Sequence, residues 1–94
     1  MLIISGRLFV KPGTRDEFLK CCEPSIAMAR RAPGCLDFSV SADIIEPDRA
    51  NVYEAWTDAQ RLEAFRASGT DDPSFAFIVR ADVERHEVSR SGPP

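Results

Sequence analysis

Apolar and polar residues alternate along three stretches of the chain. From Leu2 to Val10 the apolar side chains recur with period two, and Gly6 falls on the same face. The strictest alternation covers residues 35–44, and residues 51–57 are rich in β-branched and aromatic residues. The pattern predicts three strands. Turn residues at 46–49 are typical of an antiparallel hairpin that joins the second strand to the third.

A helical pattern separates the first two predicted strands. Residues 11–13, Lys-Pro-Gly, end the first strand, and Thr14 and Glu17 have the spacing of a capping box. Pro24 lies inside the helical stretch and predicts a kink or a widened turn, and Pro-Gly at 33–34 ends the helix. Apolar residues at helical spacing predict one face packed on the sheet: Phe18, Cys22, Ile26 and Ala29.

The C-terminal part of the chain has a weaker pattern. Asp58 suits the N-cap of a second helix, which Ser-Gly at 68–69 ends. Residues 71–80 fit a short helix and a strand equally well; we favour a short helix, followed by a strand over about 82–88. Residues 89–94 lack apolar side chains and end in Gly-Pro-Pro, which predicts a flexible C-terminal tail.

The element order is therefore β-α-β-β-α-β, the ferredoxin-like split βαβ pattern of the α+β class. Right-handed crossovers place both main helices on one face of a four-stranded antiparallel sheet. We expect a single domain over residues 1–88. The uncovered sheet face would carry Ile3 and Phe9, which is apolar enough to predict that a second copy covers it in a homodimer.

Composition narrows the function classes. With 94 residues and a formal net charge of −3, the chain has no basic field that would attract nucleic acid or anionic lipid. The N-terminal apolar run stops after four residues, so we expect no membrane span and a cytoplasmic protein. Three cysteines and a single histidine lack disulfide or ligand spacing, and we expect neither a disulfide scaffold nor a metal site.

One segment pairs a carboxylate with the only indole of the chain. Glu54 and Trp56 alternate onto the same face of the third strand, where they could line a pocket. The alternative is that Trp56 is core packing and that Glu54 forms an ion pair with Arg7 across the sheet. His86 could carry a proton near neutral pH, but its charged neighbours favour an exposed position in the last strand.

Aromatic residues offer a further candidate feature. They could wall an apolar cavity between sheet and helices that suits a flat aromatic ligand, or they could fill that space as a packed cluster. Periodicity does not separate the two possibilities. The residues concerned are Phe18, Phe38, Phe65, Phe75 and Phe77.

Several motifs in order resemble the antibiotic biosynthesis monooxygenase (ABM) family over about residues 2–88. They are Val10-Lys11-Pro12-Gly13, Glu17-Phe18, Pro33-Gly34-Cys35, and Tyr53-Glu54-Ala55-Trp56 followed by Asp58-Ala59. The resemblance implies a dimeric α/β barrel with a cleft between sheet and helices in each subunit. It also implies oxidation of a small aromatic, quinol-like or polyketide substrate by molecular oxygen, without cofactor or metal.

The resemblance also implies site residues. Trp56 matches a tryptophan that lines the family's substrate cavity, and Glu54 would be the base; these are the expected catalytic residues. The expected substrate-binding residues are Val52, Phe38, Phe65 and Phe75.

The chain departs from the family pattern at two polar positions. Val52 stands where the aromatic-polyketide monooxygenases have asparagine, and Leu62 stands where they have tyrosine. The haem-degrading branch is disfavoured, because Gly6 lies where that branch has an asparagine and the only histidine lies in the last strand. These departures favour an alternative function, a non-catalytic ligand-binding or stress-associated dimeric barrel. A third possibility is an isomerase-like relative that uses one acid/base residue.

Overall fold

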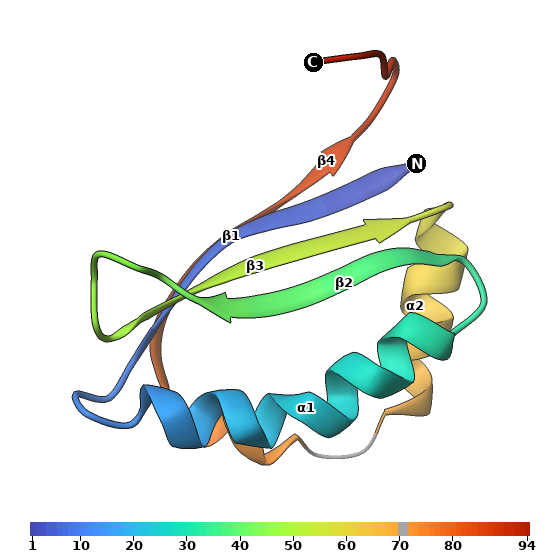
Figure 1. The fold of residues 1–94 in the computed structure, drawn as a ribbon. Helices are drawn as coiled ribbons and strands as arrows, with labels where there is room; N and C mark the ends of the chain where they lie inside the picture. The colour runs from blue at the N-terminus through green and yellow to red at the C-terminus, as the bar shows by residue number, and fades with distance from the viewer. Residues whose placement is uncertain (70–71) are drawn as a thin grey trace.

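The chain folds as a four-stranded sheet with its helices on one side (Figure 1). The structure is a computed structural model and describes residues 1–69 and 72–94. It confirms the predicted β-α-β-β-α-β order. The elements are β1 (Leu2–Val10), α1 (Arg15–Arg31), β2 (Cys35–Ala42), β3 (Arg49–Trp56), α2 (Ala59–Ser68), the 3₁₀ helix η1 (Pro73–Phe77) and β4 (Ile78–Glu87).

The strands are all antiparallel, in the order β2-β3-β1-β4. In Figure 1, α1 runs along one face of the sheet and α2 lies at one end of the same side. Side chains buried between these layers form two clusters. One contains Leu2, Ile4, Trp56 and Leu62, and the other contains Val10, Phe18, Cys22 and Ala50.

The last strand is longer than the sequence pattern predicts. A short helix does precede it, but β4 begins at Ile78, four residues before the predicted start at 82. The reason is pairing with β1, which continues as far as Val10 opposite Ile78 across a bulge between Phe9 and Val10. The N–H of Lys11 also donates to the carbonyl of Phe77 (2.9 Å). Residues 70 and 71, part of the ambiguous stretch, lie outside the described residues.

The hairpin loop between β2 and β3 also differs from the prediction. The alternation extends to residue 44, yet β2 ends at Ala42 and Ile44 is 95% exposed. The cause is the Asp43 carboxylate, which accepts hydrogen bonds from the backbone N–H groups of Ile45 (3.1 Å) and Glu46 (2.8 Å). Hydrogen bonds lower the pKa of the Asp43 carboxyl to about 2. The bond from the Glu46 N–H has the largest effect, and the bond from the Asn51 side-chain amide comes next. A side chain thus ends the strand pairing.

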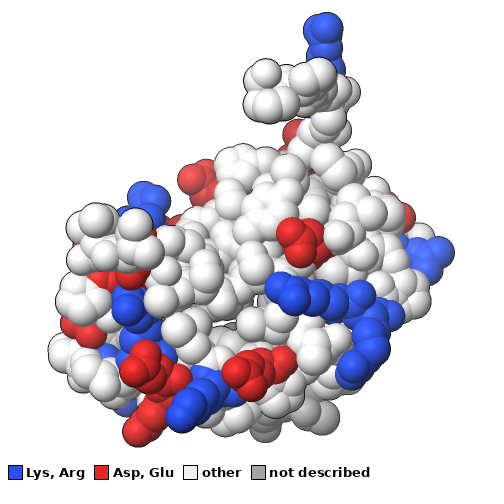
Figure 2. Space-filling model, in the orientation of Figure 1, with Lys and Arg blue, Asp and Glu red and all other residues white. Residues whose placement is uncertain are grey.

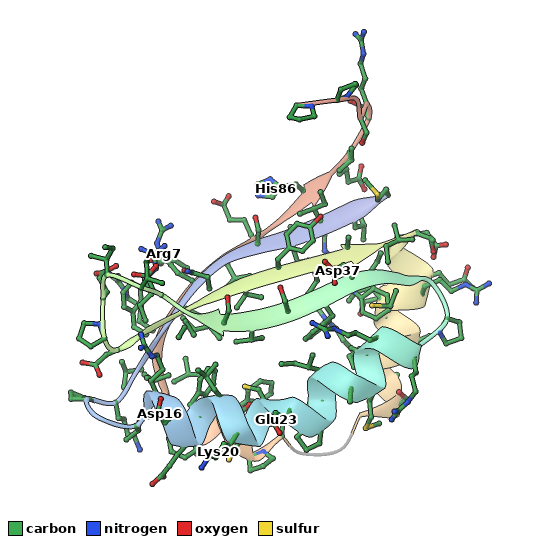
Figure 3. The ribbon with its side chains drawn as sticks, viewed as in Figure 1. Arg7, Asp16, Lys20, Glu23, Asp37 and His86 are labelled. Carbon is green, nitrogen blue, oxygen red and sulfur yellow. The ribbon has the colours of Figure 1, made fainter. Side chains whose placement is uncertain are left out.

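The start of α1 has a different cap from the predicted capping box. Thr14 precedes the helix as expected, but it makes no side-chain capping bond; its hydroxyl donates to the Lys11 carbonyl instead (2.6 Å). The helix continues through Pro24 to Arg31, as the sequence predicts. Asp16, Lys20 and Glu23 are exposed side chains of α1 (Figure 3).

Gly6 allows β1 and β4 to approach closely. Its φ is +153°, and a Cβ at this position would collide with the backbone carbonyl oxygen of Asp82. β1 is therefore held against β4 at a point that tolerates no side chain.

The sheet face away from α1 carries Arg7 and His86 (Figure 3). Arg7 lies 3.8 Å from the Asp82 carboxylate on this face. His86 is exposed in the last strand, as its charged neighbours indicated. Residues 89–94 form no helix or strand. Among the described residues, no helix has the length and apolar character needed to cross a membrane.

Candidate functional site

A cavity of about 300 Å³ lies between the sheet and α1. All four strands contribute side chains to its wall, and α1 closes the opposite side. We call it the sheet chamber; the residues that define it here are Ile4, Phe18, Ile26, Val40, Val52 and Ile78. In the space-filling view an opening is visible between the sheet and α1 (Figure 2). The volume falls in the range of small-molecule sites.

A second cavity, of about 640 Å³, adjoins the first between the helices. We call it the helix chamber; its own lining residues are Cys21, Pro24, Met28, Phe65, Gly69 and Pro73. The two chambers meet at a set of residues that line both, which we call the waist. The waist residues are Ser25, Phe38, Glu54, Arg66, Asp72 and Phe75. The two chambers therefore adjoin one another at the waist.

Glu54 points into this site from an interior strand. On β3 it pairs with Ile4 of β1 and Phe38 of β2, which places it on the face that α1 covers. Its Oε1 accepts a hydrogen bond from the Trp56 indole N–H (3.0 Å). Burial raises the pKa of the Glu54 carboxyl above its ordinary value, and the Trp56 bond and the Arg66 charge oppose that rise.

The alternative ion pair of Glu54 with Arg7 does not form. Arg7 pairs in register with Asn51 and lies on the other face of the sheet, beside Asp82. Side chains two residues apart on a strand share a face, whereas Glu54 and Asn51 are three apart. The register therefore separates the two groups, and the predicted pairing is wrong.

Trp56 is fully buried beneath the site. Its ring packs on Phe65, with the ring centroids 5.4 Å apart, and its neighbours include Leu2 and Leu62. Trp56 is absent from the lining of both chambers, and its indole N–H is taken up by Glu54. Trp56 thus reaches the site through Glu54, whose carboxylate it holds in place.

The predicted substrate-binding residues all reach the site. Val52 lines the sheet chamber, Phe65 lines the helix chamber, and Phe38 and Phe75 belong to the waist. Phe75 is 69% exposed and stands at the rim. Phe38 meets Phe65 edge to face at 6.2 Å, so the aromatic residues both pack on one another and leave a cavity.

Three polar residues at the waist escaped the sequence analysis. Arg66 follows Leu62 by one helical turn, so the helical spacing carried a signal for it. The sequence held no signal for Asp72 and Ser25, because they come from separate elements. The Ser25 hydroxyl donates to Asp72 Oδ2 (3.0 Å), and the Ser74 backbone N–H donates to Asp72 Oδ1 (2.9 Å). This contact ties η1 to α1 across the site.

Two of the three cysteines, Cys22 and Cys35, have thiols that burial makes less acidic. Burial, the largest effect, raises the pKa of the Cys22 thiol to about 11, and burial also raises the pKa of Cys35. Neither thiol is therefore a ready nucleophile at neutral pH. Within 1–69 and 72–94, no three His, Cys, Asp or Glu side chains gather in a way that could hold a metal ion.

The fold and the site together define a ferredoxin-like α+β protein with an apolar cavity between sheet and helices and a half-buried carboxylate, Glu54, in its wall. Residues 1–75 match the family model "Antibiotic biosynthesis monooxygenase". The chain belongs to this family, as the sequence motifs indicated.

Solved structures share the fold at low sequence identity. A protein from Deinococcus radiodurans, provisionally assigned as an antibiotic biosynthesis monooxygenase, superimposes with a TM-score of 0.86 at 16% identity, over 100% of this chain and 98% of its own. A structure named antibiotic biosynthesis monooxygenase superimposes with a TM-score of 0.80 at 21% identity, over 96% of this chain and 100% of its own. The protein PA3566 from Pseudomonas aeruginosa superimposes with a TM-score of 0.80 at 17% identity, over 95% of this chain and 94% of its own.

A curated relative is the uncharacterized protein sll1783 from Synechocystis. It is 27% identical over 62 residues, which is 66% of this chain. The matched segment spans 42% of the relative's length.

Proposed function

We propose that this protein is a cofactor-independent monooxygenase that oxidises a small aromatic, quinol-like or polyketide substrate with molecular oxygen. The observation that carries the proposal is a half-buried carboxylate, Glu54, facing an apolar cavity of ligand size. Membership of the ABM family supports the general class of activity.

Glu54 is the base in this proposal. A raised pKa brings a carboxylate closer to the pKa of an acidic phenol or enol, which makes proton transfer between them easier. The Trp56 N–H holds one oxygen of the carboxylate, and the other oxygen, Oε2, has no hydrogen bond among the described residues. Oε2 would accept the proton of a substrate hydroxyl at the waist.

Oxygen then reacts with the electron-rich anion. For a substrate with a reactive CH₂ group, such as an anthrone, the balance is R₂CH₂ + O₂ → R₂C=O + H₂O. One oxygen atom enters the substrate, the other leaves as water, and the four electrons come from the substrate. The chain's task is to bind the ring, take up and return the proton through Glu54, and keep bulk water away with apolar walls such as Phe38 and Val40.

The second candidate is a non-catalytic ligand-binding protein of the same family. Val52 supports it, because this residue lines the sheet chamber and supplies no polar group there. Leu62 supports it too, because its side chain is fully buried in the core instead of facing the site.

Oxygen uptake with a panel of hydroquinones and anthrones tests the two candidates. The oxygenase proposal expects turnover by the wild type and a loss of about a hundredfold or more in Glu54→Gln, the scale of general base catalysis. Glu23→Gln is the matched control, because Glu23 is an exposed carboxylate on α1 that lines neither chamber. Absence of turnover by the wild type on every compound would favour the binding protein.

The proposal includes a homodimer, a dimeric α/β barrel located in the cytoplasm. It is supported by apolar side chains on the sheet face that no described helix covers, Ile3, Phe9 and Tyr53, which lie beside polar groups. Arg80 stacks over the Phe9 ring at 4.3 Å on this face. Sedimentation at micromolar concentration should give about twice the chain mass of 10.4 kDa; a species at the chain mass alone would contradict the dimer.

A further inference from the structure

The site has two chambers, and its polar side chains are concentrated where they meet. Four ionisable or hydroxyl-bearing residues line both chambers: Ser25, Glu54, Arg66 and Asp72. By contrast, the residues that line only the helix chamber include no charged side chain, and neither do the residues that line only the sheet chamber. A ligand that fills both chambers therefore meets polar groups at its middle and apolar walls at both ends.

The charged side chains at the waist differ in how many hydrogen bonds and ion pairs they already make. The Asp72 carboxylate accepts from the Ser25 hydroxyl and the Ser74 N–H, one bond on each oxygen. Glu54 has one oxygen bonded, to Trp56. Arg66 lies 3.9 Å from Glu63, whose Oε1 is bonded more closely by Arg85 at 3.0 Å. Glu54 and Arg66 thus keep the greater capacity for a ligand.

We propose that the ligand is a bipartite aromatic molecule whose acidic hydroxyl lies between two apolar ring units. One ring unit occupies the sheet chamber, the other occupies the helix chamber, and the hydroxyl donates to Glu54 while its oxygen accepts from Arg66. The inference rests on the proposed function in that it takes the same site and the same base, but it concerns binding and needs no oxidation.

Two isomers separate this geometry from simple hydrophobic binding. 2-Hydroxybiphenyl carries its hydroxyl beside the bond between its rings, and 4-hydroxybiphenyl, with the same composition, carries it at one end. Titration calorimetry without oxygen should show the 2-isomer binding at least tenfold more tightly than the 4-isomer and than biphenyl. Equal or tighter binding of the 4-isomer, or no binding of the 2-isomer, would overturn the proposal.

Variants test whether both chambers are used. Met28 lines only the helix chamber and is 50% exposed, so Met28→Phe narrows that chamber without disturbing the core. We expect Met28→Phe to weaken the binding of 2-hydroxybiphenyl about tenfold. The binding of 2-naphthol, whose two rings are fused into one unit, should change by less than twofold. Leu36→Phe is the matched control, because Leu36 is similarly exposed and lines neither chamber.

The outcomes are separable from those of the proposed function. If 2-hydroxybiphenyl binds selectively but no substrate is oxidised, the bipartite site stands and the oxygenase proposal fails. If substrates are oxidised but Met28→Phe weakens 2-hydroxybiphenyl no more than Leu36→Phe does, the bipartite site fails. Thermal melts of both variants should match the wild type, and Ile26→Phe, on the sheet-chamber side, should weaken 2-hydroxybiphenyl and 2-naphthol alike.

Discussion

Replacing Trp56 by phenylalanine isolates the hydrogen bond that holds Glu54. The substitution keeps an aromatic ring in the core and removes the indole N–H that lies 3.0 Å from Glu54 Oε1. A hydrogen bond to a charged group contributes about 1.5–3 kcal/mol. This bond favours the ionised carboxylate, so its loss should raise the pKa of Glu54 further.

The size of the rise follows from the energy of the bond. One pKa unit corresponds to about 1.4 kcal/mol, so complete loss would raise the pKa by about one to two units. Part of Glu54 remains open to water, which can replace some of the lost bond, and we therefore expect the lower end, about one unit. A carboxyl titration by carbon-detected NMR, with glutamate labelled, measures the pKa directly.

Phe65→Leu is the control for looser packing. Phe65 packs on Trp56 but makes no hydrogen bond to Glu54. Loosening this cluster admits water, which lowers the desolvation of Glu54 and moves its pKa toward the ordinary value. The two variants should therefore shift the pKa in opposite directions. An unchanged or lower Glu54 pKa in Trp56→Phe would refute the positioning role assigned to Trp56.

Three further predictions concern stability and reactivity. Because the folded-state pKa of Glu54 is raised, the stability of the wild type should fall as pH rises from the ordinary glutamate pKa through the raised pKa of Glu54, and thermal melts of Glu54→Gln should lack that fall. Gly6→Ala should lower the free energy of unfolding in urea by at least about 3 kcal/mol, since its Cβ meets β4 backbone. Gly13→Ala, in open space at φ +76°, should cost only about 1–2 kcal/mol. Cys22, with a pKa of about 11, should react with iodoacetamide far more slowly at neutral pH than the partly exposed Cys21, as peptide mass spectrometry would show; equal rates would contradict its burial.

The sequence predicted those strands in which apolar and polar residues alternate, because helices cover only one face of the sheet. β1 and the helix α1 were found with their boundaries nearly correct, because Leu2 to Val10 alternates and Pro-Gly pairs mark the turns. β4 was predicted too short. Its N-terminal part forms because β1 offers a partner edge as far as Val10, and pairing of distant segments leaves little trace in local periodicity.

The site was predicted less completely than the fold. Glu54 was recognised because period-two alternation places it on the same face as Trp56, the only tryptophan of the chain. The pattern could not show that the Trp56 N–H is bonded to Glu54 instead of facing the cavity. Asp72 joins the site through Ser25 of another element, and no local signal predicts such a contact.

The two chambers differ in how freely their walls can change. The sheet chamber is built from side chains such as Ile4 and Phe18 that also form the buried core, so a substitution there lowers the stability of the whole domain. The helix chamber is walled by exposed side chains such as Met28 and Pro73, whose replacement disturbs no core packing. After gene duplication, substitutions at these positions would change which ring unit the helix chamber accepts, while the waist that meets the hydroxyl, and the fold, stay as they are.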